Sequence, residues 1–168
     1  MKHMQIQGKC KQNGQAGLPP TSGHWCGLEI PSTLSRIPEV EEAILRQCEK
    51  FSYTDRDLFA LKLALDEAIA NAVKHGNKMD RHKSVHIKYR VTSRRVDVVV
   101  GDEGPGFNPA NLPDPTDDGR LDCPGGRGIL LMRAFMNNVV YNPSGNSVTL
   151  TKFNESPRRF VSRNVAFG

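Results

Sequence analysis

The stretch LDEAIANAVKHG, residues 65–76, carries a carboxylate and an amide at helical spacing inside an otherwise largely apolar segment. Glu67 and Asn71 are four residues apart, so in a helix they lie one turn apart on the same face. His75 continues that line approximately, whereas Leu65 lies on the opposite side. The polar side chains therefore point away from the core stripe and are candidates for binding a ligand.

A helix over about residues 55–75 is predicted around this stretch, with Gly76 placed to stop it. Along the polar face we expect Ala60 and Ala64, where a solvent face would more often carry long charged side chains. An Asn side-chain oxygen suits Mg²⁺, and a neighbouring Glu can activate a hydroxyl or water. An incidental polar helix face is the alternative explanation.

Outward from this helix, the periodicity predicts the order β, α, α, β, β, α, β, β. The other helices are expected over about residues 33–51, where Pro38 either starts or kinks the helix, and 128–137. Strands are expected over residues 24–30, 84–92, 95–101, 138–141 and 147–153. Paired antiparallel strands with helices on one face predict an α+β two-layer sandwich with a mixed, mostly antiparallel sheet.

A second polar motif, DEGPGF at residues 102–107, follows a predicted strand directly. Asp102 at a strand end can accept a hydrogen bond from an exocyclic amine such as that of adenine. Gly104 and Gly106 allow close backbone approach to a flat ring. The alternative is a simple turn.

A third motif, GGRG at residues 125–128, immediately precedes a predicted helix. Glycines that open a helix favour an anion, because unpaired N–H groups and the helix dipole attract phosphate. Arg127 can add a charged contact. No Gly-Lys-Ser/Thr follows, so this is not a P-loop, and a flexible linker is the alternative.

Between these motifs, residues 108–124 are rich in Pro and Asp, and we expect them to form a mobile lid. Four acidic side chains there repel a triphosphate unless Mg²⁺ bridges them or they turn outward. Residues 1–23 are expected to be a disordered leader, 24–154 one folded domain, and 155–168 a basic tail.

Composition excludes several classes of protein. The chain has 168 residues, about one domain, and a net charge of +5 from 23 Lys+Arg and 18 Asp+Glu. The basic residues are scattered, which disfavours direct nucleic-acid binding. A membrane span and a signal peptide are not expected, so we expect a cytoplasmic protein. The four irregularly spaced cysteines are expected to be free thiols.

In this order, the three motifs resemble those of the GHKL ATPase superfamily over roughly residues 24–153. The short form with Glu-Ala-x-x-Asn-Ala-x-x-His-Gly is most similar to bacterial anti-sigma-factor serine kinases. The resemblance implies the Bergerat ATP-binding fold, with ATP and Mg²⁺ as ligands.

The resemblance also implies a role for individual residues. Asn71 would bind Mg²⁺ through its side-chain oxygen, Glu67 would be the general base, and Asp102 would bind the adenine amine. Asn146 stands where the family has a Thr, with Ser147 after it. The expected nucleotide-binding residues are Asn71, His75, Asp102, Gly104, Gly106, Phe107, Gly125, Gly126, Arg127, Gly128, Ile129, Asn146 and Ser147.

The implied function is a regulatory switch. Such a protein binds a sigma factor, phosphorylates a serine on an antagonist of the STAS type, and forms a homodimer. Two alternatives are an ATP-dependent protein-binding module without kinase activity, and a stand-alone histidine-kinase-like ATPase domain. A histidine kinase would need a dimerisation helix pair with a phosphoacceptor His, whereas we expect the residues before the first predicted helix to be mostly disordered.

Overall fold

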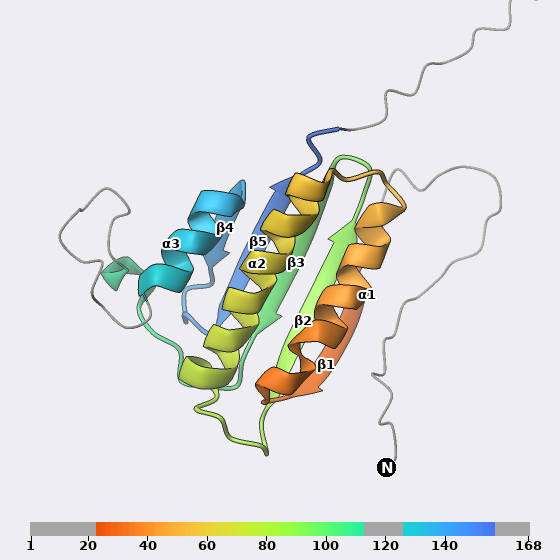
Figure 1. Cartoon of the computed structure of the whole chain (residues 1–168). Helices are drawn as coiled ribbons and strands as arrows, with labels where there is room; N and C mark the ends of the chain where they lie inside the picture. Colours follow the sequence, from red (N-terminus) through yellow and green to blue (C-terminus); the bar gives the residue numbers. More distant parts are fainter. Residues whose placement is uncertain (1–22, 113–125, 157–168) are drawn as a thin grey trace, which may run out of the picture.

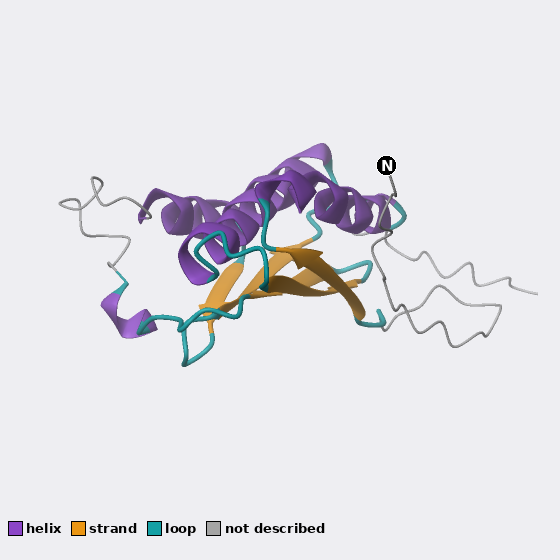
Figure 2. Cartoon of the chain, turned by 90° about the horizontal axis from the view of Figure 1, so that it is seen from below, coloured by secondary structure: helices purple, strands orange, loops and turns teal. Residues whose placement is uncertain are grey.

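The computed structural model describes residues 23–112 and 126–156, and these form two layers. One layer is a five-stranded sheet in the order β1-β2-β3-β5-β4, and the other consists of helices packed on one of its faces (Figures 1 and 2). The strands are β1 (Cys26–Pro31), β2 (Ser84–Val91), β3 (Arg95–Gly101), β4 (Asn138–Tyr141) and β5 (Ser147–Phe153). The helices are α1 (Ile37–Glu49), α2 (Asp55–Asn71) and α3 (Gly126–Phe135).

The predicted α+β two-layer fold is therefore confirmed. All of the strand pairings between the described strands are antiparallel, so the sheet is not mixed. Because β5 pairs with β3 rather than with β4 alone, Gly101 at the end of β3 lies opposite Ser147 at the start of β5. This pairing brings the motif after β3 and the start of β5 to the same end of the sheet.

Alternating side chains build the core between the layers. Val96, Val98 and Val100 of β3 are buried beneath the helices, as the period of two along a strand requires. Leu61, Leu65 and Ile69 cover them from α2, and each is fully buried or nearly so. Core packing thus fixes the rotation of α2 about its axis, and with it the direction of Glu67 and Asn71.

Local signals set where the helices begin. Thr54 and Asp57 form a capping box at the start of α2, in which each side chain accepts the backbone N–H of the other. Pro38 lies in the first turn of α1, where its missing N–H costs nothing, so it starts this helix rather than kinking it. A short 3₁₀ turn, Leu34–Arg36, precedes α1.

Several helix ends differ from the prediction. The α-helical pattern of α2 stops at Asn71, and a π-helical turn, Ala72–Gly76, completes it. α3 begins at Gly126 rather than at residue 128, and it ends at Phe135 because Asn137 N–H bonds to Thr151 O in β5. Gly128 is therefore part of the first turn of α3 and not of a loop before it.

Other expectations are also corrected or lie outside the described residues. Ala60 and Ala64 were expected beside the ligand site, but both are buried in the core and neither lines the cavity described below. Cys48 is a free, buried thiol, but Cys26 is disulfide-bonded and so is not the free thiol we expected. The proposed leader and most of the proposed lid and tail fall outside the described residues. No helix of the described part is long and apolar enough to cross a membrane.

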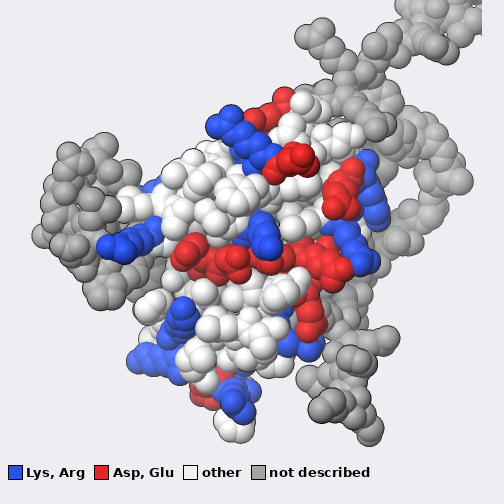
Figure 3. Space-filling view, viewed as in Figure 1, with Lys and Arg blue, Asp and Glu red and all other residues white. Residues whose placement is uncertain are grey.

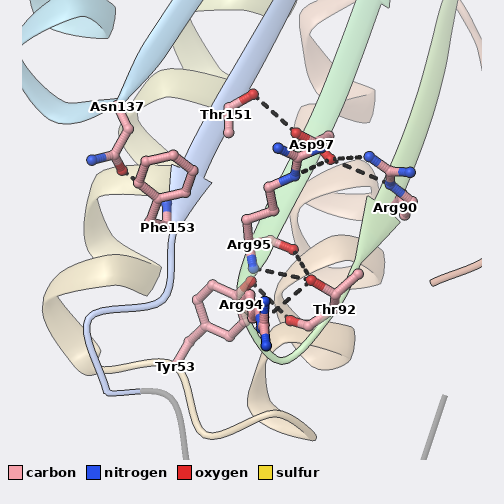
Figure 4. A network of polar contacts seen from close by, with 9 residues as sticks. All are labelled: Tyr53, Arg90, Thr92, Arg94, Arg95, Asp97, Asn137, Thr151 and Phe153. Atoms are coloured by element: carbon pink, nitrogen blue, oxygen red, sulfur yellow. Dashed lines mark hydrogen bonds and ion pairs between the residues drawn. The ribbon is translucent and has the colours of Figure 1, made fainter. Parts of the chain in front are cut away.

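The face of the sheet away from the helices carries a polar network (Figure 4). Asp97 of β3 is buried there and accepts hydrogen bonds from Arg90 Nη2 at 2.6 Å, Arg95 Nε at 3.1 Å and Thr151 Oγ1 at 3.0 Å. These partners come from β2, β3 and β5, so the network ties three adjacent strands together.

Candidate functional site

A cavity of about 330 Å³ lies at the end of the sheet where β3 stops and β5 starts. It is enclosed by the last turns of α2, the π turn, the segment after β3, and the start of α3. Among the residues predicted from the sequence, those that line it are Asn71, His75, Asp102, Gly106, Phe107, Ile129 and Ser147.

The cavity walls are mostly apolar, with a few polar groups. Ala68, Ala72, Val100, Ile129 and Val148 supply much of the apolar lining. A concave, mainly apolar space with a few placed polar groups is typical of small-molecule sites. The chemistry therefore suits a flat aromatic ring with one polar edge, such as adenine.

Asp102 supplies a carboxylate to this cavity. Burial raises the pKa of Asp102, while the hydrogen bond from Gly104 N–H at 2.8 Å and the charge of Lys83 act to lower it. Among the described residues the carboxylate accepts only that one hydrogen bond, so it keeps acceptor capacity for a ligand. Gly76 makes room for it, because a Cβ there would lie 2.2 Å from Asp102 Cγ.

Two glycines with positive φ hold the floor of the site. Gly106 has φ of 70° and Gly145 has φ of 69°, a conformation that L side chains rarely adopt. A Cβ on Gly106 would lie 1.9 Å from Ser144 O, and one on Gly145 would lie 2.0 Å from Phe107 O. Only glycine permits this backbone-to-backbone packing. The rings of Phe107 and Tyr141 then meet edge to face at 5.1 Å.

Glu67 and Asn71 lie beside the first turn of α3. A Cβ on Gly128 would lie 2.4 Å from Glu67 Oε2 and 3.4 Å from Asn71 Nδ2. Both polar side chains therefore face Gly128, which is buried. Asn71 also lines the cavity, so it connects the apolar compartment to the carboxylate of Glu67.

Mg²⁺ fits the Asn71 side chain as a partly coordinated ion. Asn71 offers an amide oxygen, a ligand type that Mg²⁺ takes, and the ion usually keeps several waters or phosphate oxygens as well. Among residues 23–112 and 126–156 there is no cluster of three or more His, Cys, Asp or Glu side chains able to hold a metal. The donor set thus suits a metal shared with phosphates rather than an all-protein cage.

The remaining predicted residues do not line the cavity. Gly104 packs against the π turn, since a Cβ there would lie 2.1 Å from Gly76 O. Asn142 Nδ2 donates to the side-chain Oδ1 of Asn146 at 2.8 Å, and Asn146 does not line the cavity. Arg127 is exposed, and Gly126 is the first residue of α3. Gly125 lies outside the described residues.

Several lining residues were missed by sequence reasoning. Gly76 was expected only to stop a helix, yet it makes space for Asp102. Tyr141 at the end of β4 and Gly145 in the β4–β5 turn line the cavity, far along the chain from the helix and strand motifs at residues 65–76 and 102–107. The positive-φ requirement in a Pro-Ser-Gly-Asn turn was a signal for Gly145, but the contact with Phe107 was not predictable from it.

The chain is similar in sequence to several known protein kinases. The chain is 31% identical over 133 residues to the serine-protein kinase RsbW of Bacillus subtilis (strain 168), which covers 75% of this chain and 83% of that relative. It is 29% identical over 140 residues to the RsbW of Bacillus velezensis, covering 79% and 88%. It is 35% identical over 97 residues to the serine/threonine-protein kinase BtrW of Bordetella bronchiseptica, covering 55% and 68%. Residues 30–152 match the model of the histidine kinase-like ATPase domain. The chain therefore belongs to the histidine kinase-like ATPase domain family.

Proposed function

We propose that this protein is an ATP-dependent protein-serine kinase that binds a sigma factor and phosphorylates a serine on a small antagonist protein. Use of ATP follows from membership of the ATPase family. The kinase assignment is supported by the relatives, which carry the name serine-protein kinase. The observation that carries the proposal is the cavity that has Asp102 on its wall and Asn71 next to Glu67 at the first turn of α3.

Base binding occupies the apolar part of the cavity. Asp102 accepts the exocyclic amine of adenine, and Ser147 adds a hydroxyl nearby. The apolar walls exclude water from the ring, which strengthens that hydrogen bond. Adenine is favoured over a base with a carbonyl in that position, because two acceptors would then face each other.

Phosphate binding occupies the side of the cavity toward α3. The free N–H groups of the first turn of a helix and its dipole attract phosphate oxygens. Gly128 lets the first turn of α3 approach Glu67 and Asn71 closely, because a Cβ there would lie 2.4 Å from Glu67 Oε2. Asn71 would hold Mg²⁺ through its side-chain oxygen, and the bound ion would neutralise charge on the phosphates.

Transfer places the substrate serine between Glu67 and the terminal phosphate. Glu67 takes the hydroxyl proton while the serine Oγ forms its bond to the terminal phosphorus. The bond from that phosphorus to the bridging oxygen breaks, and ADP carries away the electron pair. Positioning and charge stabilisation account for most of the catalysis in such reactions, and these residues supply both.

A protein partner suits the surface of the helical layer better than a nucleic acid does. Acidic side chains form a band across this face, and the Lys and Arg side chains lie on either side of it (Figure 3). A phosphate backbone needs a continuous basic surface, which this face does not offer. Sigma-factor binding, the antagonist and the homodimer are parts of the proposal that rest on the resemblance, and the cytoplasmic location is a part that rests on the sequence composition.

Calorimetric titration of the protein with ATP, with and without Mg²⁺, tests the nucleotide site. We expect Mg²⁺ to strengthen binding, because it neutralises phosphate charge beside Glu67. Folded protein that binds no ATP in either condition contradicts the proposal.

Phosphotransfer to a serine-bearing antagonist tests the kinase assignment. Glu67→Ala should leave ATP affinity nearly unchanged and lower the transfer rate by about 10²–10⁴-fold, the range for loss of a general base. Glu42→Ala, an exposed glutamate of α1, is the matched control. A normal rate in Glu67→Ala would show that Glu67 is not the base.

Acid-labile phosphate on a partner His would favour the histidine-kinase-like alternative. ATP binding without transfer to any partner would favour the binding module.

A further inference from the structure

Asn77, directly after the π turn, is buried and uses both ends of its side chain. It has 0% exposure. Its Oδ1 accepts the backbone N–H of Glu103 at 2.8 Å, and its Nδ2 donates to Ser84 O at 2.9 Å. The side chain therefore ties the end of the α2 helical segment to the start of β2 and to the segment after β3.

The bond to Glu103 acts on its neighbour, Asp102. Asp102 N–H donates to Asn146 O at 3.0 Å, which fixes the peptide before Asp102. Glu103 N–H donates to Asn77, which fixes the peptide after it. Since both flanking peptides are held, the backbone torsions of Asp102 are held too, and they set where its carboxylate points.

The π turn explains how Asn77 reaches this position. Asn77 N–H bonds to Ala72 O at 2.7 Å, a spacing of five residues that widens the last turn. The next two residues, Lys78 and Met79, have φ of 55° and 60°, although neither is glycine. Strained backbone persists where surrounding contacts enforce it, and it gathers near functional sites. Here Met79 N–H bonds to Val73 O at 2.8 Å and holds the chain reversal in place.

We propose that Asn77 is the positioning residue that orients Asp102 and thereby sets the preference of this site for adenine over other bases. The proposal rests on the proposed ATP binding at this cavity and adds a residue that does not line the cavity. The alternative is that Asn77 only stabilises the fold and has no effect on base preference. The test below distinguishes these two roles.

The chain offers a matched control at the other end of the sheet. Asn154 is also buried, with 5% exposure. Its Nδ2 donates to Phe51 O and to Ser93 O, each at 3.1 Å, and its Oδ1 accepts Ser156 N–H at 3.0 Å. Asn154→Ala therefore removes a comparable buried amide without touching the segment that holds Asp102.

The test measures dissociation constants for ATP and for inosine triphosphate, which has a carbonyl oxygen in place of the exocyclic amine of adenine. In Asn77→Ala we expect affinity for ATP to fall about tenfold and affinity for inosine triphosphate to change less than about threefold. Asn154→Ala should lower the melting temperature similarly and keep the wild-type ratio of the two constants. Asn77→Asp, which keeps an acceptor for Glu103 N–H, should retain most of the ratio.

A double variant sharpens the result. In Asp102→Asn the preference for ATP should already be lost, so adding Asn77→Ala should lower ATP affinity less than about twofold further. Full additivity of the two losses overturns the proposal. If Asn77→Ala does not fold, Asn77→Ser replaces it, since the shorter side chain cannot reach both partners and water can solvate it.

The outcomes also separate this inference from the proposed function. If wild-type protein fails to bind ATP, or binds both nucleotides equally, the adenine site itself is refuted and the role of Asn77 falls with it. If wild-type protein prefers ATP and folded Asn77→Ala keeps the same ratio, only the role of Asn77 is refuted.

Discussion

Two aspartates of the same sheet differ in how fully they are paired. The carboxylate of Asp97, near the start of β3, accepts hydrogen bonds from the side chains of Arg90, Arg95 and Thr151 (Figure 4). Asp102, just past the end of β3, accepts one hydrogen bond among the described residues, from Gly104. A carboxylate that the protein saturates holds strands together, whereas one that keeps acceptor capacity in an apolar cavity is available to a ligand.

The surroundings follow the same division. At the Asp97 end, Tyr53 Oη donates to Thr92 O, and Lys152 pairs with Asp57 inside the protein. At the Asp102 end, glycines at 76, 106 and 128 permit close packing, because a Cβ on each would clash with Asp102, Ser144 O or Glu67. The Asp97 end, or closed end, is filled by polar pairing, whereas the Asp102 end, or open end, holds the mostly apolar cavity. Substitutions at the two ends should therefore affect different quantities.

The largest expected effect is on stability at the closed end. Lys152→Met removes the partner of Asp57, which has 0% exposure, and breaking a buried ion pair costs about 3–5 kcal/mol. Urea unfolding should show this loss, while the dissociation constant for ATP stays unchanged in the folded protein. Lys50→Met, at an exposed lysine, is the control. A parallel loss of ATP affinity in folded protein would show that the two ends are coupled.

This loss should depend on pH. Burial acts to raise the pKa of Asp57, but hydrogen bonds from Thr54, Glu155 and Lys152 outweigh it, so the pKa lies below its usual value. A carboxyl with a lowered folded pKa contributes stability above its unfolded pKa, and this is lost as pH falls through the folded pKa. The difference between wild type and Lys152→Met should therefore shrink in strong acid.

The second prediction concerns the open end. Asp102→Asn should weaken ATP binding by about 1.5–3 kcal/mol, or roughly ten- to 150-fold, because it removes a charged acceptor for the adenine amine. Its unfolding free energy should change little. Asp97→Asn is the reciprocal control, since it should lower stability and leave ATP affinity intact. Unchanged affinity in folded Asp102→Asn would remove the adenine assignment.

A third prediction tests a carboxyl buried between the helices, away from both ends. Burial raises the pKa of Glu41 from 4.5 to about 7, with the charge of Asp66 adding to the effect and that of Lys62 opposing it. Because the folded pKa is raised, wild-type stability falls as pH rises from about 4.5 to about 7. Glu41→Gln removes this titration and should stabilise the protein by about 1–2 kcal/mol at pH 8, given 1.36 kcal/mol per pKa unit and the lost pairing with Lys62.

The check is denaturant unfolding at several pH values. Wild type and Glu41→Gln should differ least near pH 4 and most above pH 7. Glu39→Gln, on the same helix but more exposed, should show no comparable change. A constant difference at all pH values would show that Glu41 does not titrate as described.

The smallest expected effect returns to the closed end. Tyr53→Phe deletes the hydrogen bond from Tyr53 Oη to Thr92 O at 3.0 Å. The net loss should be about 1 kcal/mol in unfolding free energy, with no change in ATP affinity. Thermal unfolding measures it, and Tyr89→Phe, a buried tyrosine of β2, provides the comparison.

The sequence determined the local elements and the order of the motifs. β3, β4 and β5 have the predicted bounds, and α2 begins at the predicted Asp55, because side-chain period, turn residues and caps act over a few neighbours. Helical spacing alone placed Glu67 and Asn71 on one face. These features depend on short-range geometry, which is written in consecutive residues.

The tertiary structure decided which distant residues meet. The π turn, the bond from Glu103 to Asn77, and the packing of Gly145 on Phe107 join segments that are far apart in the chain. Tertiary packing also placed Ser147 on the cavity wall and turned Asn146 toward Asn142. It buried Ala60 and Ala64 in the core, away from the cavity. Such contacts depend on how β3 and β5 pair and how α2 rotates against the sheet, and those are set by packing of the whole core rather than by any local pattern.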